Sequence, residues 1–160
     1  HAASDAEGEY ARRILVDMET AKKSGKRLSD AYSAEMLAPY AIQPNTDLKK
    51  PFKVVLLVNE MCASMCDIFA GIMQDNKMAT IVGTRTMGAG GNVVNYNQAP
   101  NSHLDLRQTE SLIVRKDGSY IENNGVTPEV VMAVNESAKD KYSDVTTKAF
   151  DILVGKPEKK

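Results

Sequence analysis

The most constraining feature of the sequence is a short hydrophobic run that ends at a polar corner. Residues 54–58 read VVLLV, and the polar pair Asn59–Glu60 follows them directly. A short run rich in β-branched residues predicts a buried strand over residues 53–58. Small residues come next, ending at Ser64, and apolar residues at helical spacing follow. The pattern predicts a strand-to-helix turn at Ser64.

The segment after this corner completes a larger unit. Helical spacing predicts a helix from Ser64 to Asn76, with Ile68, Ile72 and Met73 on its core face. The sequence ATIVG at residues 79–83 predicts a second strand. Strand, helix and strand in this order are typical of a right-handed βαβ unit with a parallel sheet. The fold class is therefore α/β, and 160 residues are enough for one domain with a buried core.

Other elements are expected from local patterns. They are a helix over residues 9–24 that stops at Gly25, a helix from about Leu28 to Leu37, a strand at residues 92–97, a hairpin with a two-residue turn at Asp117–Gly118, a short extended segment near residues 125–132, and a helix over about 144–154 that Ser143 or Asp144 introduces and Gly155 closes.

Composition excludes several classes of function. A net charge of −1 gives no general attraction to nucleic acid or anionic membranes. No apolar stretch approaches the roughly 20 residues needed to span a bilayer. Two histidines far apart in sequence predict no metal site, and no cofactor is expected. Cys62 and Cys66 are expected to be free thiols, because four-residue spacing on a helix holds them too far apart for a disulfide.

The corner at Ser64 has two interpretations. Ligands bind beyond the carboxyl ends of strands in open α/β sheets, and a helix N-terminus carries a positive partial charge. Ser64 can therefore be a nucleophile, with the Met65 N–H donating to the developing oxyanion. The ordinary alternative is that Ser64 caps the helix. Cys62 or Cys66 as the nucleophile is a further possibility, since helix N-termini lower the pKa of thiols, although buried packing is the more usual role.

A serine nucleophile needs a base, and the residues alone do not close a triad. The histidines are His1, at the chain end, and His103, in a loop rich in turn-forming residues where a surface role is the default. The loop at residues 84–92 contains Gly88, Gly90 and Gly91, which can admit a substrate backbone or only permit a turn. We favour a substrate-lining or interdomain loop.

Methionines gather in the sequence around the corner. Soft core packing is their expected role, and an apolar specificity pocket is the alternative. They are Met61, Met65, Met73, Met78 and Met87.

Two blocks resemble a known family. The sequence VVLLVNEMCASMCDIFAGIMQDNKMATIVGTRTMGAGGNV, together with the later YIENNGVTPEVVM, resembles the signature of the S41 serine peptidases, the tail-specific or C-terminal processing proteases. The resemblance covers about residues 53–132. It implies a ClpP/crotonase-like βαβ superhelical core, of which residues 1–160 would be the C-terminal portion of the catalytic domain. The family's nucleophile falls on Ser64.

The resemblance also favours one branch of the family. Members with a Ser/Lys dyad carry the lysine in a Thr-x-Gly-Lys-Gly loop, whereas here the loop reads TMGAGG and that position is Ala89. The branch of the tricorn-type proteases and the chlamydial protease-like activity factor uses serine, histidine and glutamate instead. By that match the glutamate is Glu122, whose ordinary alternative is a surface charge. In that branch the histidine comes from an N-terminal part of the polypeptide. Asp75 is expected to be structural and held by a local hydrogen bond.

The function implied by the resemblance is that of a serine-type endopeptidase acting through an acyl-enzyme on Ser64. Its partners would be a protein or peptide substrate and either an N-terminal fragment of the same enzyme or a homo-oligomer partner. Location in the periplasm or outside the cell is implied by the family alone. The alternatives are a catalytically inactive S41-like binding or scaffold module, and acyl-CoA chemistry of the crotonase type, against which the serine corner counts.

Overall fold

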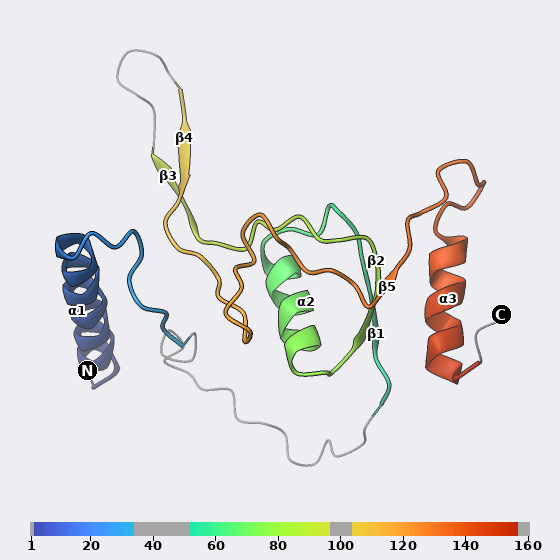
Figure 1. Cartoon of the computed structure of the whole chain (residues 1–160), viewed down its shortest axis with the longest axis horizontal. Coiled ribbons are helices and arrows are strands. Elements are labelled where there is room, and N and C mark those ends of the chain that lie inside the picture. The colour runs from blue at the N-terminus through green and yellow to red at the C-terminus, as the bar shows by residue number, and fades with distance from the viewer. Residues whose placement is uncertain (1, 34–51, 97–103, 157–160) are drawn as a thin grey trace. The chain divides into compact units, whose positions relative to one another are not determined.

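The computed structural model describes residues 2–33, 52–96 and 104–156, with side chains in the first segment from residue 8 onward. The chain divides into two compact units, His1–Lys50 and Pro51–Lys160, which we describe separately (Figure 1). The assignment of the whole chain to one domain stays a prediction.

The first unit contains helix α1 (Ala2–Lys23), which begins earlier than its sequence pattern predicts. It ends as predicted, because Gly25 has a positive φ of 73° and its N–H donates to the Lys22 carbonyl. The Tyr32 ring packs edge-on against Tyr10, and its hydroxyl donates to Asp17 at 2.5 Å. This hydrogen bond raises the pKa of Tyr32 to about 12.

The second predicted helix is wrong over residues 28–33, which contain no helix, and its remainder lies outside the described residues. Two features explain the difference. The Ser29 hydroxyl donates to the Asp30 carbonyl, a local bond that competes with helix formation. Tyr32 also contacts α1, so the segment folds back instead of starting a new helix.

The second unit is built on the predicted βαβ unit. Strands β1 (Val55–Val58), β2 (Thr80–Gly83) and β5 (Val130–Val131) form a parallel sheet in the order β1-β2-β5. Helix α2 (Met65–Asp75) connects β1 to β2 (Figure 1). The register pairs Val58 with Gly83, so the carboxyl ends of β1 and β2 meet at one edge of the sheet.

The face that α2 buries differs from the prediction. The buried residues of the helix are Asp67, Ala70 and Gly71, whereas Ile72 is 49% exposed. Ile68 and Met73 are half-buried. Small side chains let the helix approach its neighbours closely: a Cβ at Gly71 would lie 3.4 Å from Ile121. The periodicity predicted the helix correctly but placed its inner face one residue away.

A hydrophobic core joins the sheet to the helix and to a later turn. Its buried members are Val58, Cys62, Ala70, Ile81 and Val126. Helix α3 (Ser143–Val154) packs against β1 and β2 and buries Val145 and Ala149. None of the helices in the described ranges is both long and apolar enough to cross a bilayer.

The two ends of α3 differ in how well they match the predicted capping residues. Gly155 closes the helix in the left-handed region, as expected, with a φ of 70°. The start lies within one residue of the predicted one, but the predicted cap is wrong, because the N-cap residue is Tyr142 rather than Ser143 or Asp144, and its side chain makes no capping hydrogen bond. Asp144 lies in the first turn, where an acidic residue favours the helix dipole.

A second sheet and a hairpin complete the unit. Strand β3 (Val93–Tyr96) was predicted, but its antiparallel partner β4 (Leu106–Thr109) was not (Figure 1). In the hairpin, Val114 pairs with Tyr120 and the Arg115 N–H donates to the Ser119 carbonyl. Its loop therefore has three residues, 116–118, rather than the expected two.

Candidate active site

The turn at Ser64 is the most unusual backbone feature of the site. Ser64 occupies the N-cap position of α2 with φ 57° and ψ −122°, yet its hydroxyl makes no capping hydrogen bond. A positive φ costs energy for a residue with a Cβ, so surrounding contacts must hold it. The side chain is exposed. Serine nucleophiles of another hydrolase fold are presented on a strained strand-to-helix turn of this kind.

Backbone hydrogen bonds connect this turn to the glycine-containing loop at residues 84–92. The Ser64 N–H donates to the Ala89 carbonyl at 2.9 Å, and the Met87 N–H donates to the Cys62 carbonyl at 2.9 Å. The Met65 N–H, the first of α2, has no hydrogen-bond partner among the described residues. That donor is oriented by the helix and remains available to a ligand.

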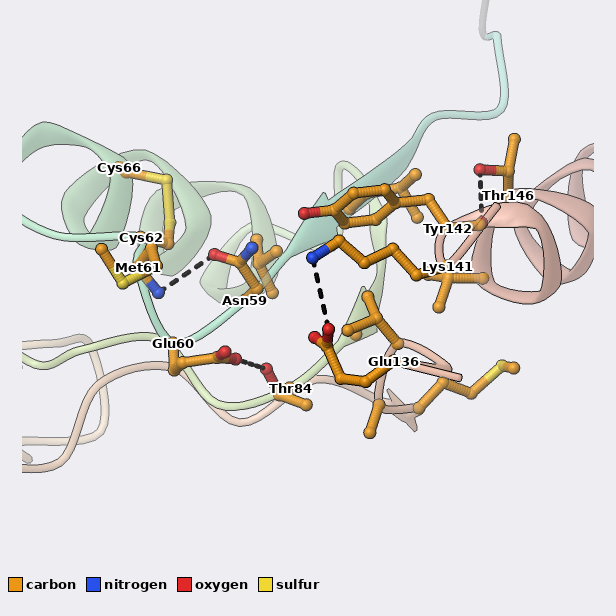
Figure 2. A pocket seen from close by; sticks show the side chains of 17 residues that line it. Asn59, Glu60, Met61, Cys62, Cys66, Thr84, Glu136, Lys141, Tyr142 and Thr146 are labelled. Atoms are coloured by element: carbon orange, nitrogen blue, oxygen red, sulfur yellow. Dashed lines mark hydrogen bonds and ion pairs between the residues drawn. A yellow bond between two sulfur atoms is a disulfide. The ribbon is translucent and has the colours of Figure 1, made fainter. Parts of the chain in front are cut away.

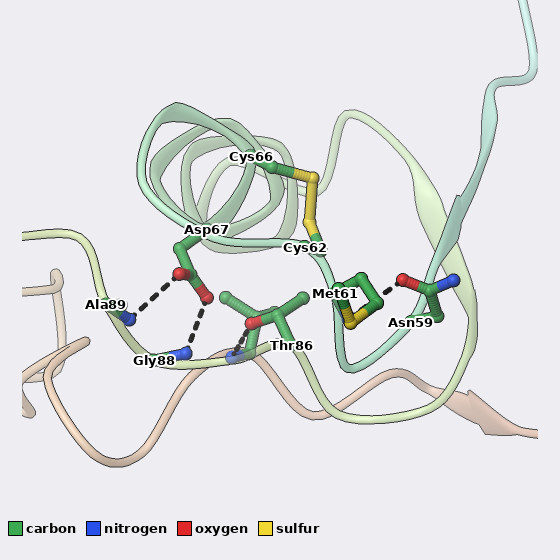
Figure 3. The surroundings of a disulfide bond; sticks show 9 residues. Asn59, Met61, Cys62, Cys66, Asp67, Thr86, Gly88 and Ala89 are labelled. Carbon is green, nitrogen blue, oxygen red and sulfur yellow. Dashed lines mark hydrogen bonds between the residues drawn. A yellow bond between two sulfur atoms is a disulfide. The ribbon is translucent and has the colours of Figure 1, made fainter.

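Asp67 fixes the loop from the other side and was missed in the sequence. Its side chain is fully buried, and its two carboxylate oxygens accept the Gly88 and Ala89 N–H groups, each at 2.9 Å (Figure 3). An acid in the first turn of a helix is unremarkable in a sequence. The only signal was that this acid lies three residues after Ser64, in the first turn of the predicted helix.

The two cysteines form a disulfide, so the prediction of free thiols is wrong (Figure 3). The prediction assumed that both residues lie on the helix. Cys62 instead precedes the turn at Ser64, and the Cα atoms of Cys62 and Cys66 are 5.2 Å apart, within the usual range for disulfides. A disulfide sulfur is not a thiolate, which removes both cysteines as nucleophiles in this state.

The three loop glycines pack against the chain itself. Gly88 has φ 79°, and a Cβ there would lie 2.7 Å from the Gly125 nitrogen. A Cβ at Gly90 would lie 3.0 Å from Ile121. At Gly91 it would lie 2.7 Å from the Glu122 carboxylate. Close packing therefore explains these glycines, and a substrate-lining role stays a prediction.

Glu122 lies against the same loop. Its Oε2 atom accepts the Ile113 N–H at 3.0 Å, whereas Oε1 is buried and has no hydrogen-bond partner among the described residues. The neighbouring Asn123 N–H donates to the Gly88 carbonyl at 2.9 Å. The same loop thus lies against both candidates. Its Ala89 carbonyl accepts the Ser64 N–H, and Gly91, two residues further along, lies next to the Glu122 carboxylate.

The remaining titratable candidates are His1, His103 and Asp75. His1 and His103 lie outside the described residues. Asp75 is structural as predicted, because Arg115 donates to both of its carboxylate oxygens.

The expectation of methionine core packing is wrong for four of the five methionines. Met73 is half-buried. The exposed fractions of the other side chains are 74% for Met61, 66% for Met65, 58% for Met78 and 44% for Met87.

A cavity of about 870 Å³ adjoins the corner (Figure 2). It lies at the carboxyl ends of β1 and β2, with the disulfide on one side and the start of α3 on the other. Much of its lining is apolar, including Leu57, Met132 and Val145. The Thr84 hydroxyl donates to Glu60 at 2.7 Å and lowers the pKa of that carboxyl group. No cluster of side chains suited to a metal ion occurs within the described ranges.

Comparison with protein families identifies the class. The model of peptidase family S41 matches residues 9–132 of this chain. The chain therefore belongs to peptidase family S41, a family of serine peptidases.

Individual relatives and solved structures support the assignment to this family. An uncharacterized protein of Chlamydia muridarum is 40% identical over 114 residues, which cover 69% of this chain and 18% of the relative. A carboxy-terminal-processing protease of Bartonella bacilliformis is 32% identical over 112 residues, covering 70% of this chain and 24% of the relative. The crystal structure of mature CPAF superposes with a TM-score of 0.65 and 30% identity, covering 91% of this chain and 27% of that one. The chain thus spans about a quarter or less of the length of these relatives.

Proposed function

We propose that this chain carries the serine and the glutamate of an S41 endopeptidase active site. The observation that carries the proposal is the exposed Ser64 turn, whose hydroxyl is not used as a helix cap. The loop that holds this turn also lies against Glu122, whose buried Oε1 atom has no hydrogen-bond partner in the part of the chain that the structure describes. Family membership gives the reaction class, which is hydrolysis of a peptide bond.

The chemistry follows from the groups present. A histidine takes the proton of Ser64 as its Oγ attacks the peptide carbonyl, and then passes it to the leaving amine. The Met65 N–H at the positive end of α2 donates to the oxyanion. Water then attacks the acyl-enzyme and regenerates Ser64. Oε1 of Glu122 would accept the N–H of the far histidine nitrogen, which fixes the tautomer and stabilises the imidazolium.

The histidine in this proposal comes from an N-terminal segment of the same enzyme or from a partner chain. The chain covers only 27% of the mature CPAF chain on which it superposes, so the relatives have ample polypeptide outside this region. The dyad lysine offers no alternative base, because its position in the loop is Ala89. The chain would then be the C-terminal portion of the catalytic domain.

Export to the periplasm or the cell exterior is part of the proposal. The Cys62–Cys66 disulfide supports it, since disulfides persist mainly in oxidising compartments and are rare in the cytosol.

A fluorophosphonate probe tests the nucleophile in the full-length natural protein. We expect one covalent adduct, mapped to Ser64 by peptide mass spectrometry and absent in Ser64→Ala. Ser137→Ala, which changes another exposed serine, is the matched control and should label normally. A folded full-length protein that carries no adduct at Ser64 would contradict the proposal and favour the scaffold alternative.

A further inference from the structure

We propose that the Cys62–Cys66 disulfide is a positioning element of the Ser64 site and makes the activity depend on the redox state. This inference rests on the proposed function, because it concerns how the same serine is presented. Cys62 and Cys66 enclose three residues, of which Ser64 is the middle one. The bond between Cys62 and Cys66 (Figure 3) therefore closes a small covalent ring whose backbone includes Ser64.

The ring connects the end of β1 to the first turn of α2, which are also linked by a hydrogen bond from the Cys66 N–H to the Ala63 carbonyl at 3.1 Å. Cys62 is buried in the core below the end of β1, and its N–H donates to the Asn59 carbonyl at 3.0 Å. Cys66 belongs to the first turn of α2. With both ends fixed and their Cα atoms 5.2 Å apart, the backbone of the three enclosed residues must bend sharply. The positive φ of Ser64 lies at the centre of that bend.

A competing conformation exists for this residue. A serine at a helix N-cap ordinarily adopts an extended backbone, and its hydroxyl accepts a hydrogen bond from the second or third N–H of the helix. In α2 those N–H groups belong to Cys66, which already donates to the Ala63 carbonyl at 3.1 Å, and to Asp67. Relaxation to that conformation would satisfy the helix end but turn the hydroxyl away from a substrate. The disulfide opposes this relaxation because the extended conformation lengthens the path between Cys62 and Cys66.

The bond is open to reduction from one side. Cys62 is 6% exposed, whereas Cys66 is exposed. A dithiol supplies two electrons and two protons: one of its thiolates attacks Cys66, Cys62 leaves as a thiolate and is protonated, and the dithiol becomes a cyclic disulfide while both cysteines become thiols. The reduced site would keep every side chain of the proposed triad but lose the tether.

The test compares oxidised and reduced full-length natural protein with two readouts. The first is the rate of fluorophosphonate labelling at Ser64, with kcat and KM for a peptide substrate. The second is hydrogen exchange in the peptide of residues 62–68, which contains the Ser64 N–H bonded to Ala89. The peptide of residues 80–83, in β2, reports on the fold. Cys66→Ser removes the bond at an exposed position, so buried Cys62 is unchanged.

Reduction of the wild type, and Cys66→Ser without reductant, should each slow labelling and lower kcat by about tenfold or more. KM should change little, exchange in residues 62–68 should accelerate, and exchange in β2 should stay constant. Dithiothreitol should have no further effect on Cys66→Ser.

Three results overturn the inference. They are two free thiols in the untreated protein, labelling and kcat that do not respond to reduction, or exchange that rises equally in β2 and the corner. Failure of the proposed function looks different, because the oxidised protein would then carry no adduct at all. In that case, hydrogen exchange that reduction accelerates only at residues 62–68 still supports the positioning role of the disulfide. Hydrogen exchange that reduction leaves unchanged overturns that role as well.

Discussion

The two halves of the site, the serine corner and the glutamate turn, are held in different ways. Ser64 lies in a backbone that is fixed by hydrogen bonds to a neighbouring loop and by a disulfide. Glu122 has one oxygen bonded to the Ile113 N–H and one buried oxygen without a partner among the described residues. The Ser64 backbone is thus held by contacts within this chain, whereas Glu122 has capacity for one more hydrogen-bond donor. A nucleophile needs a fixed position, whereas a carboxylate that orients a histidine needs an acceptor left open for it.

The two halves are joined at three places. Asp67 and Asn123 hold the Gly88–Ala89 segment from opposite sides. At the far end of α2, Arg115 donates to Gln74 and Asp75 and so ties the hairpin before Glu122 to the helix that begins after Ser64. Substitutions at Asp67 and Arg115, together with one at Glu122 itself, separate the roles of the halves.

The largest expected effect is on Glu122. Glu122→Gln keeps the shape of the side chain but removes the charge that stabilises an imidazolium. Loss of the corresponding carboxylate in a serine triad lowers kcat by about 10⁴-fold, so we expect about 10³–10⁴-fold in the full-length protein, with thermal unfolding little changed. Glu110→Gln, which changes an exposed glutamate away from this turn, is the control. An unaltered kcat in Glu122→Gln would leave the glutamate half without a catalytic role.

Removal of Asp67 should have the next largest effect and should act on stability. Asp67→Ala leaves the Gly88 and Ala89 N–H groups without their buried acceptor, and each unsatisfied group costs about 1–3 kcal/mol. We expect unfolding free energy to fall by about 3 kcal/mol in urea denaturation. Asp144→Ala, at an exposed acid of α3, should change it by less than about 1 kcal/mol. Equal losses in both variants would show that the Asp67 bonds do not stabilise the loop.

Loss of the ion pair between Arg115 and Asp75 should lower the free energy of unfolding by a smaller amount. Its side chain is 13% exposed and that of Asp75 is 18% exposed, so Arg115→Met leaves a mostly buried carboxylate unpaired. Removing one partner of a fully buried pair costs about 3–5 kcal/mol, and residual solvent lowers our expectation to about 2 kcal/mol. Faster hydrogen exchange should be confined to the hairpin at residues 113–121. Arg107→Met, on exposed β4, should be silent in both measurements.

The smallest effect concerns the edge of the serine corner. The Thr84 hydroxyl lowers the pKa of Glu60, so Thr84→Val should raise that pKa toward its ordinary value in an NMR titration. A carboxyl whose folded pKa is depressed adds stability above its unfolded pKa, and this is lost as pH falls through the folded pKa. The variant should therefore lose less stability than the wild type on acidification through that range. Thr127→Val is the control and should leave the pKa of Glu60 unchanged. If the pKa of Glu60 is also unchanged in Thr84→Val, the Thr84 hydrogen bond is not what lowers it.

Much of the fold was predictable because its signals are local. The run at residues 54–58 and the helical spacing after Ser64 gave β1 and α2, and Gly25 and Gly155 marked helix ends. Strand β4 was missed because its sequence, LRQT, is fully exposed and shows no alternation of apolar and polar residues. The inner face of α2 was misplaced because an acid and two small residues, Asp67, Ala70 and Gly71, are buried there, whereas the pattern was read from the larger apolar residues beside them.

The sequence by itself determined the strand, the corner and the helix, and its resemblance to family motifs led to the proposal of Ser64 and Glu122 as catalytic residues. Only the tertiary structure decided how these residues are held: the disulfide across the turn, the Asp67 bonds to a loop 21 residues away, and the free oxygen of Glu122. The physical reason is that local backbone preferences are written in neighbouring residues. Hydrogen bonds and a covalent bridge between segments depend instead on which backbones the sheet brings together at one edge.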